Sequence, residues 1–497
     1  MNSILLTSVL IPIEAGILLL ALNLYEKQTG KKAVNGKMLH ALVTAVLLAA
    51  SFFALYAAWT GDWSLQLFEL VDGIRLYFHV DAVGRIFVTV LCIVWVLAGV
   101  YSFVYMEHEG AEKFFYGFYL LCFGVLIGLC FAGNMVTYYL FFELMTLTSM
   151  PMVLHNGSRE AIMAALKYLF FSMCGAYAAL FGIFVLNRYC VTDDYFAGGT
   201  LDMTLVSGHE TICLIAVMAM LIGFGVKAGM LPLHAWLPTA HPVAPSPASS
   251  VLSAIIVKFG VLAMVRTVFY VVGVDFLRGT WVQYTWMTLS LLTVFMGSML
   301  AYREKVFKKR LAYSTVSQAS YILYGLSVMT PLGFVGAMLH TAAHAMIKSG
   351  LFLIAGVFLF KYGYTEVSQL KGLGKKMPVL MWCYTILSLA LIGIPPTGGF
   401  VSKWYLAEGS LQSGIAIYTW LGPVVLLISA LLTAGYLLPI TLKGFFPGEK
   451  AESSEKKDEP AALMLIPIII LTALAVLIGL FPNPIYKYVA VFAADFF

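Results

Sequence analysis

Apolar windows of about twenty residues recur along nearly the whole chain, and they limit its possible folds more than any other feature. A helix of that length crosses the hydrocarbon core of a bilayer, where only helices and closed barrels satisfy all of their backbone hydrogen bonds. Hydrophobic residues make up 61% of the 497 residues and charged residues 11%, whereas soluble domains carry about 25% charged residues. The sequence therefore predicts an all-α polytopic membrane protein.

The windows predict about fourteen transmembrane helices. The first window has no basic stretch before it, so we expect it to be retained as a helix rather than removed as a signal peptide. The expected extents are residues 3–23, 38–59, 80–105, 114–132, 134–154, 161–187, 211–231, 248–273, 282–300, 311–329, 332–360, 378–408, 416–442 and 462–481.

Basic residues gather in alternate loops and predict the orientation of the chain. Cytoplasmic loops carry the excess of Lys and Arg, so we expect these loops inside a cell membrane and both termini outside. Residues 449–460 are typical of a solvated linker. The basic clusters are Lys27, Lys31, Lys32 and Lys37; Arg303, Lys305, Lys308, Lys309 and Arg310; Lys361, Lys371, Lys375 and Lys376; and Lys443, Lys450, Lys456 and Lys457.

Two of the windows contain a lysine beside a proline and glycine break. Lys227 lies in LIGFGVKAGMLPLHAWLP, and Lys403 lies in LALIGIPPTGGFVSKWYL. A lysine at the bilayer centre costs about 2.5–3.5 kcal/mol, and a broken helix is tolerated there only where protein or a water-filled cavity satisfies its backbone. Both features together indicate that something charged moves through the interior.

The two broken windows are the seventh and the twelfth, and an offset of five inverts the second unit relative to the first. Inverted units with paired broken helices are typical of transporters that bind ions at the break. We therefore expect two inverted five-helix repeats. The predicted domains are residues 1–110 (helices 1–3), 111–275 (helices 4–8), 276–445 (helices 9–13) and 446–497 (the linker and helix 14).

Further polar side chains lie within the apolar windows. Glu143 is near the middle of the fifth window, and a buried carboxylate is costly unless it is paired, so Lys227 is its expected partner. Lys167 is a second candidate partner, although it lies close enough to the helix start to reach the interface. Lys258 is well inside the eighth window. His234 and His241 lie in the broken stretch that follows Lys227. Each could be a proton carrier or a structural histidine held by hydrogen bonds.

His340, His344 and Lys348 are spaced four residues apart in the eleventh window. Each step turns about 40° and rises about 6 Å, so the three form a polar file on one helix face. A metal site is less favoured, since the sequence does not supply an obvious further ligand. Histidine accepts and releases protons near its ordinary pKa of about 6.5, so the file predicts a proton relay.

Seven cysteines are scattered along the chain without a CxxC pair. This spacing argues against iron–sulfur, haem c and structural zinc sites. We expect no cofactor and no metal in this chain, so any redox chemistry would belong to another subunit.

These segments resemble the antiporter-like subunits shared by respiratory complex I, Mrp cation/proton antiporters and membrane-bound energy-converting hydrogenases. The resemblance covers most of the chain, from about residue 80 to about 445. It implies the family's fold of fourteen helices with two inverted five-helix units, each with a half-channel. It rests on the window around Glu143, the Lys258 window, KAGMLPLHAWLPTAHPVAPSP, KKRLAYSTVSQ, HTAAHAMIKSGLFL and PPTGGFVSKW.

The resemblance implies a role for each matching residue. Glu143 and Lys227 would form a gating ion pair, and Lys258 would pass the proton along a central axis. His344 would extend that axis with the help of His340 and Lys348, and Lys403 would be the exit carrier. Lys308 stands where the family often has a basic residue, although it borders a loop.

The resemblance also implies partners, namely further antiporter-like subunits, small membrane subunits and, in redox-driven assemblies, a peripheral redox arm. The transported ion would be H⁺, alone or together with Na⁺. Lys403 replaces a glutamate of one complex I subunit, and the chain ends too soon for the lateral helix of another, so an Mrp D-type or hydrogenase-type subunit is favoured. A stand-alone Na⁺ or solute transporter and a scaffold without transport remain alternatives.

Overall fold

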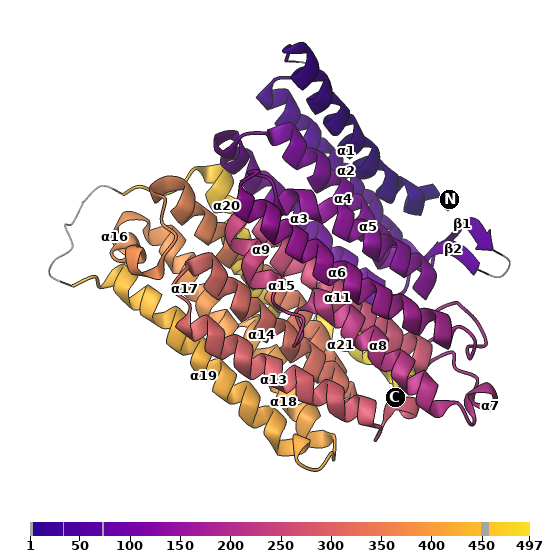
Figure 1. The fold of residues 1–497 in the computed structure, drawn as a ribbon. Coiled ribbons are helices and arrows are strands. Elements are labelled where there is room, and N and C mark those ends of the chain that lie inside the picture. Colours follow the sequence, from indigo (N-terminus) through magenta and orange to yellow (C-terminus); the bar gives the residue numbers. More distant parts are fainter. Residues whose placement is uncertain (1–2, 33, 72–73, 449–456) are drawn as a thin grey trace.

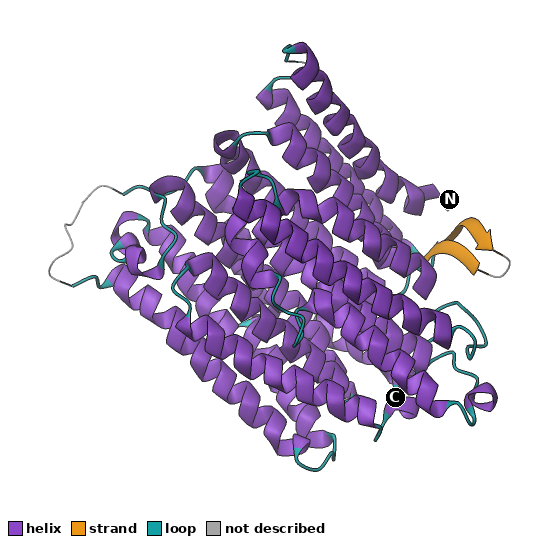
Figure 2. Ribbon diagram, in the orientation of Figure 1, coloured by secondary structure: helices purple, strands orange, loops and turns teal. Residues whose placement is uncertain are grey.

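The structure, a computed structural model, describes residues 3–32, 34–71, 74–448 and 457–497. Most of the expected linker, residues 449–456 with Lys450 and Lys456, lies outside the described residues. Long helices run roughly side by side through the described part (Figures 1 and 2).

Fourteen long helices make up most of the described bundle. A segment of shorter helices lies between α8 and α13 in the chain. The long helices are α1 (Ser3–Thr29), α2 (Gly36–Thr60), α3 (Ala82–Glu109), α4 (Glu112–Phe131), α5 (Met135–Val153), α6 (Arg159–Leu186), α8 (Glu210–Ala228), α13 (Trp281–Arg303), α14 (Phe307–Ser327), α15 (Pro331–Tyr362), α17 (Pro378–Ile392), α18 (Gly398–Gln412), α19 (Tyr418–Phe445) and α20 (Ala462–Leu480). The joining segment holds α9 (Leu237–Val243), α10 (Ser246–Val251), the π-helix η1 (Leu252–Ile256), α11 (Val257–Val265) and the π-helix η2 (Arg266–Val272). The remaining short helices are α7 (Met203–Val206), α12 (Val274–Leu277), η3 (Val367–Leu370), α16 (Leu373–Lys376), α21 (Asn483–Ala493) and η4 (Ala494–Phe496).

Each predicted window overlaps a helix or a run of consecutive helices, so the all-α membrane architecture is confirmed. Eleven helices of the described residues are long and apolar enough to cross a membrane, and α17 is a shorter apolar helix. The count of about fourteen spans is therefore not confirmed, because α5, α14 and α18 are not among these eleven.

The expected breaks are visible in the backbone. After α8, Gly229 takes a left-handed conformation with φ +76°, and the next helix, α9, begins only at Leu237. The twelfth window divides into α17 and α18, and Gly393 at the end of α17 has φ +94°. Glycine adopts this conformation without the steric cost that a Cβ brings, which explains why each helix ends there.

A β-hairpin, absent from the sequence prediction, interrupts the helices between α2 and α3 (Figure 2). Strand β1 (Ser64–Val71) pairs antiparallel with β2 (Ile74–His79). Arg75 of β2 donates to Asp194 at 2.8 Å, which ties the hairpin to the loop after α6. The hydrogen bond and the charge of Asp194 raise the pKa of the Arg75 guanidinium above its ordinary value.

The centre of the bundle is formed by α15 and the run from α10 to η2. Thr330 caps the N-terminus of α15 by accepting from the Gly333 amide at 3.2 Å, and Pro331 follows at its first turn, where its missing N–H costs nothing. α15 packs against α18, α14, α20, α10 and α17. Both central elements are almost entirely buried, so their polar side chains face protein rather than lipid.

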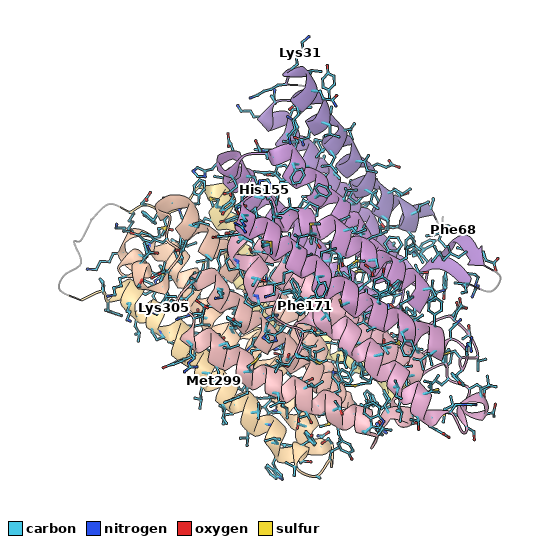
Figure 3. All side chains as sticks on the ribbon, in the orientation of Figure 1. Lys31, Phe68, His155, Phe171, Met299 and Lys305 are labelled. Atoms are coloured by element: carbon cyan, nitrogen blue, oxygen red, sulfur yellow. The ribbon has the colours of Figure 1, made fainter. Side chains whose placement is uncertain are left out.

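The hairpin, α7 and both chain ends lie at one end of the bundle (Figure 1). At this end Arg266 of η2 is fully buried, forms an ion pair with Asp81, and lies between the rings of Tyr195 and Tyr270, each 4.7 Å away. Lys31 and Lys305 mark the opposite end, which carries the basic loops, and Phe68 marks the hairpin end (Figure 3). We call these the basic end and the hairpin end.

Candidate functional site

The polar file on α15 is fully enclosed. His340, His344 and Lys348 are at most 1% exposed. The rings of His340 and His344 stack with centroids 5.7 Å apart, as their spacing of one helical turn predicts. Lys348 Nζ donates to Ser314 Oγ at 2.7 Å and to the Leu311 carbonyl at 3.1 Å, both on α14.

Lys258 joins this file from the neighbouring central element. Its Nζ lies 2.6 Å from His344 Nδ1 and donates to the Ser253 carbonyl at 2.8 Å. Lys258 lies two residues after the end of the π-helix η1, and π-helical turns are rare and often found at functional sites. A direct contact between a lysine and a histidine on two buried helices permits proton transfer between them.

Lys227 lies at the end of α8, fully buried, and its partner is a tyrosine. Its Nζ donates to the Tyr168 hydroxyl at 2.6 Å and lies 4.0 Å from the centre of that ring. The Tyr168 hydroxyl also lies 2.7 Å from Ser149 Oγ of α5. Trp236 packs on Tyr168 with ring centroids 4.6 Å apart, so the broken segment holds the tyrosine in place. Gly260 allows α8 and α11, the helices that carry Lys227 and Lys258, to approach closely. A Cβ at this position would lie 2.6 Å from the Ala228 amide nitrogen.

Glu143 is half-buried on α5 and accepts from the Tyr139 hydroxyl at 3.1 Å. Among the described residues the ion pairs do not include Glu143 with Lys227, so the expected contact is not formed in this structure. Lys167 lines a surface groove beside Phe170 and Pro238, away from the buried file.

Lys403 lies on α18, just after the second break. Its Nζ donates to the carbonyls of Leu391 at 2.6 Å and Ile392 at 3.0 Å, which the end of α17 leaves without helical partners. It also lies 4.9 Å from the centre of the Tyr321 ring. Lys227 precedes its break and Lys403 follows its own, so the two lysines do not occupy the same place relative to the breaks.

Ser402 connects the second break to the file on α15. Its hydroxyl lies 2.9 Å from His340 Nδ1, and the Tyr321 ring stacks on His340 at 5.6 Å. The structure thus brings Lys258, His344, His340 and the Lys403 helix into one connected region.

The remaining candidates lie nearer the basic end. Lys308, at the start of α14, donates to the Ala244 carbonyl. His234 is half-buried in the segment between α8 and α9. His241 is fully buried and stacks on Phe352 with ring centroids 4.7 Å apart. Within the described residues, groups of three or more His, Cys, Asp or Glu that could hold a metal ion are not found.

The hydroxyl groups that bind the lysines and histidines of the site, or the tyrosine beside Lys227, were not predicted from the sequence. Tyr168, Ser149, Ser314 and Ser402 all lie in apolar windows, where hydroxyl side chains are common and carry little signal by themselves. Their only sequence signal is that Tyr168 follows Lys167 and Ser402 precedes Lys403.

The motifs of this site fall within one family match. Residues 132–440 match the family model described as NADH:quinone oxidoreductase/Mrp antiporter, TM. The chain belongs to this family. The match includes Glu143, the buried lysines Lys227, Lys258, Lys348 and Lys403, and the histidines of α15. It confirms the resemblance inferred from the motifs.

Relatives from this NADH:quinone oxidoreductase/Mrp antiporter family cover most of the chain. NADH-quinone oxidoreductase subunit N of Desulforudis audaxviator is 31% identical over 451 residues, covering 88% of this chain and 86% of that protein. The D-type Na⁺/H⁺ antiporter subunit of Bacillus subtilis is 28% identical over 497 residues, covering 98% and 96%. A chain of the Mrp complex from Dietzia sp. has the same fold, with a TM-score of 0.82, 19% identity and coverage of 100% and 97%.

These relatives do not separate the Mrp D-type subunit from a complex I subunit, since proteins of both names match most of the chain. The family match covers the segments that hold the candidate site, within residues 132–440. The role of each residue in it stays a prediction.

Proposed function

We propose that this chain is a proton-translocating, antiporter-like subunit of a multi-subunit membrane complex of the Mrp, complex I or membrane-bound hydrogenase type. Its relatives carry the names of Na⁺/H⁺ antiporter and NADH-quinone oxidoreductase subunits, and one solved structure with the same fold is a chain of an Mrp complex. The partners would be further membrane subunits and, in a redox-driven assembly, a peripheral redox arm.

The contact between Lys258 and His344 carries this proposal. It joins the two central elements at 2.6 Å, and both side chains are at most 2% exposed. An amine and an imidazole at this distance are within reach for direct proton transfer. The proton path would run through Glu143, Lys227, Lys258, His344 and Lys403, with His340 and Lys348 in support.

The partners of the buried lysines also favour transport. Within the described residues, the side chains that hydrogen-bond with Lys227, Lys258 and Lys348 are hydroxyls and an imidazole, and Lys403 binds backbone carbonyls. A lysine locked in a permanent ion pair would have to break that pair to pass a proton. Neutral partners leave the proton free to move.

The first step would be gated by Glu143 and Lys227. In this structure each is bonded to its own tyrosine, Tyr139 and Tyr168, and we infer that a direct pair between them is the alternative state. Exchanging one charged hydrogen bond is worth about 1.5–3 kcal/mol. Moving one proton across a membrane potential of 100 mV costs about 2.3 kcal/mol. The free energy of exchanging the hydrogen bond is therefore of the size needed to gate one proton.

The proposal includes the placement of the chain in a cell membrane. We infer that the basic end faces the cytoplasm and that both termini face outside, following the distribution of Lys and Arg. We also infer that residues 111–275 and 276–445 are the two inverted repeats, each with one broken helix.

The proposal is tested with Lys227→Ala and Glu143→Ala in vesicles that contain the whole complex. We expect either variant to abolish coupled ion transport, measured with a pH-sensitive dye, while the other subunits still co-purify. Lys305→Ala, at an exposed position of the basic end, is the matched control and should transport normally. Normal pumping in both test variants would contradict the proposal.

A further inference from the structure

Glu14 lies at the centre of α1, at a depth where an ionisable side chain is costly in a membrane. The hydrophobic stretch of α1 runs from Ile4 to Leu24, and ten positions separate Glu14 from each of its ends. At 1.5 Å per residue this is about 15 Å, or half the thickness of the hydrocarbon core. The short carboxylate side chain is therefore too deep to reach either membrane surface.

Glu14 is exposed and points away from the rest of this chain. α1 lies at the edge of the bundle beside α2 and α4 (Figure 1). Its Gly16 faces α4, since a Cβ there would lie 2.7 Å from the Gly117 carbonyl oxygen. Two residues turn about 200°, so Glu14 lies on nearly the opposite side of the helix. Within the described residues, its carboxylate forms neither an ion pair nor a hydrogen bond.

The residues around Glu14 form a stripe with the spacing of a helix–helix contact. The stripe advances in steps of three, four, three, four and three residues, which is the heptad spacing of helices that pack side by side. Transmembrane helices often pack in the same way, with small residues that let the backbones approach. Five of the six members are exposed, and Thr7 is partly exposed. We call this stripe the outer face of α1; its members are Thr7, Leu10, Glu14, Ile17, Ala21 and Leu24.

A partner helix with a basic side chain suits the outer face of α1 best. The acyl chains of lipids have no hydrogen-bond donor, so they leave a carboxylate at this depth unsatisfied. A second copy of this chain does not suit the face either, because a symmetric contact would bring two Glu14 carboxylates together. A lysine or arginine of another subunit supplies both a donor and an opposite charge, and ionisable groups inside membranes pair in this way.

We propose that the outer face of α1 binds a transmembrane helix of a neighbouring subunit, and that a lysine or arginine at the middle of that helix pairs with Glu14. A single polar pair in an otherwise apolar seam fixes the register of two helices, so Glu14 sets the depth at which the partner helix docks. This inference rests on the part of the proposed function that makes the chain a subunit of a membrane complex. It does not depend on proton transport.

The first test replaces Ile17, beside Glu14 on the outer face, by the photo-reactive p-benzoylphenylalanine in the whole complex. We expect a cross-link to one membrane subunit, in a transmembrane helix that carries a lysine or arginine within about one turn of its midpoint. The control is the same replacement at Leu431 of α19, on another side of the bundle (Figure 1). Leu431 is 66% exposed and Ile17 is 56% exposed, but Leu431 should not cross-link to that helix.

The second test is Glu14→Leu, which separates a partner contact from a face that meets only lipid. On a lipid face leucine removes a costly charge, so the complex would be unchanged or more stable. Against a basic partner leucine leaves that residue unpaired, and we expect at least about tenfold less of the partner subunit to co-purify. Glu160→Leu, the same change at an exposed position at the start of α6, is the control and should retain the partner. Leucine in place of the partner's basic residue as well should restore co-purification, because both charges are then removed.

Full retention of every subunit in Glu14→Leu would overturn this inference. A cross-link from position 17 only to lipid, to a second copy of this chain or to a helix without a central basic residue would also overturn it, and so would a failure of the double replacement to restore co-purification. The proposed function would stand in each case if Lys227→Ala and Glu143→Ala still abolish transport. Normal transport in those two variants would instead overturn the proposed function and leave the contact at α1 intact.

Discussion

The buried lysines of this chain are held by neutral groups from other helices. Tyr168 holds Lys227, Ser314 holds Lys348, and the Leu391 carbonyl holds Lys403. By contrast, Arg266 at the hairpin end is held by the carboxylate of Asp81. A charge with a permanent carboxylate partner stabilises packing, since removing one partner of a buried pair costs about 3–5 kcal/mol. Lysines with neutral partners do not carry this constraint, so we expect the two kinds of residue to have different roles.

Tyr168→Phe tests the hydroxyl that holds Lys227. The variant keeps the ring beneath the amine and the packing on Trp236 but loses the hydrogen bond of 2.6 Å. A hydrogen bond to a charged group is worth about 1.5–3 kcal/mol, so we expect at least about a tenfold change in the transport rate without loss of assembly. Transport is measured in vesicles as acidification. Tyr177→Phe, at an exposed position of the same helix, is the control. Equal rates in the two variants would contradict the role of the hydroxyl.

The pair of Glu304 and Lys309 at the basic end predicts a weak pH dependence of stability. Burial acts to raise the pKa of the Glu304 carboxyl, but Lys309 at 3.0 Å and the amides of Val306 and Lys305 outweigh it and lower that pKa below its ordinary value of 4.5. A carboxyl with a lowered pKa stabilises the folded state above its ordinary pKa, and this contribution is lost as the pH falls through the lowered value.

We therefore expect the melting temperature of the purified complex to fall between about pH 5 and pH 3, and Glu304→Gln to reduce this fall. The effect should correspond to less than about 1 kcal/mol, because Lys309 is 37% exposed and solvent screens the pair. The melting temperature is measured by intrinsic fluorescence at each pH. An identical pH dependence in the parent and the variant would rule out a contribution from this pair.

Among the helices, the broken pair α17 and α18 depends on one glycine. A Cβ at Gly399 would lie 1.8 Å from the Ala390 carbonyl oxygen, a backbone atom that cannot turn away. Gly399→Ala should push the two helices apart and weaken the bonds of Lys403 to the end of α17. Overpacking of this kind costs about 1–3 kcal/mol, so we expect a lower melting temperature and reduced transport together.

The control for this glycine is Gly36→Ala at the start of α2, where a Cβ meets no atom within 4 Å. This variant should melt and transport like the parent. If Gly399→Ala behaves like Gly36→Ala, the close approach of α17 and α18 at this point is not needed by the folded protein.

The helices and their two breaks could be predicted from the sequence, because a membrane helix is recognised by its apolar length and a break by its prolines and glycines. The hairpin was missed although SLQLFELVDGIRLYFH alternates around Asp-Gly, which is a strong hairpin signal. A search for long apolar windows does not detect the alternation of apolar and polar side chains, with a period of two residues, that marks a β-strand.

The lysines and histidines of the site could also be predicted, because a charge in an apolar window is rare. Their partners could not, since Tyr168 and Ser314 reach Lys227 and Lys348 through the packing of helices far apart in the sequence. The choice between Glu143 and Tyr168 as the partner of Lys227 depends on side-chain positions of a few ångströms, and sequence spacing does not determine these.

At the scale of the whole molecule, charge divides the bundle between its two ends. The basic end carries the lysine clusters that precede α14 and follow α15, whereas the hairpin end carries Asp62, Asp193, Asp194 and Asp202. Both chain termini lie at the hairpin end (Figure 1). The lysine clusters would meet the anionic cytoplasmic leaflet favourably, at about 1 kcal/mol for each basic residue near the surface.

This division of charge predicts the orientation of the chain in the membrane. An epitope at either terminus should bind antibody on intact spheroplasts, and an epitope inserted after Gly363, in the loop that follows α15, should bind only in inverted vesicles. Gly363 has φ +66° and no atom within 4 Å of a Cβ, so an insertion there disturbs little packing. Each tagged protein must retain transport, because a misfolded chain could expose any site. Antibody binding at Gly363 on intact spheroplasts would reverse the orientation.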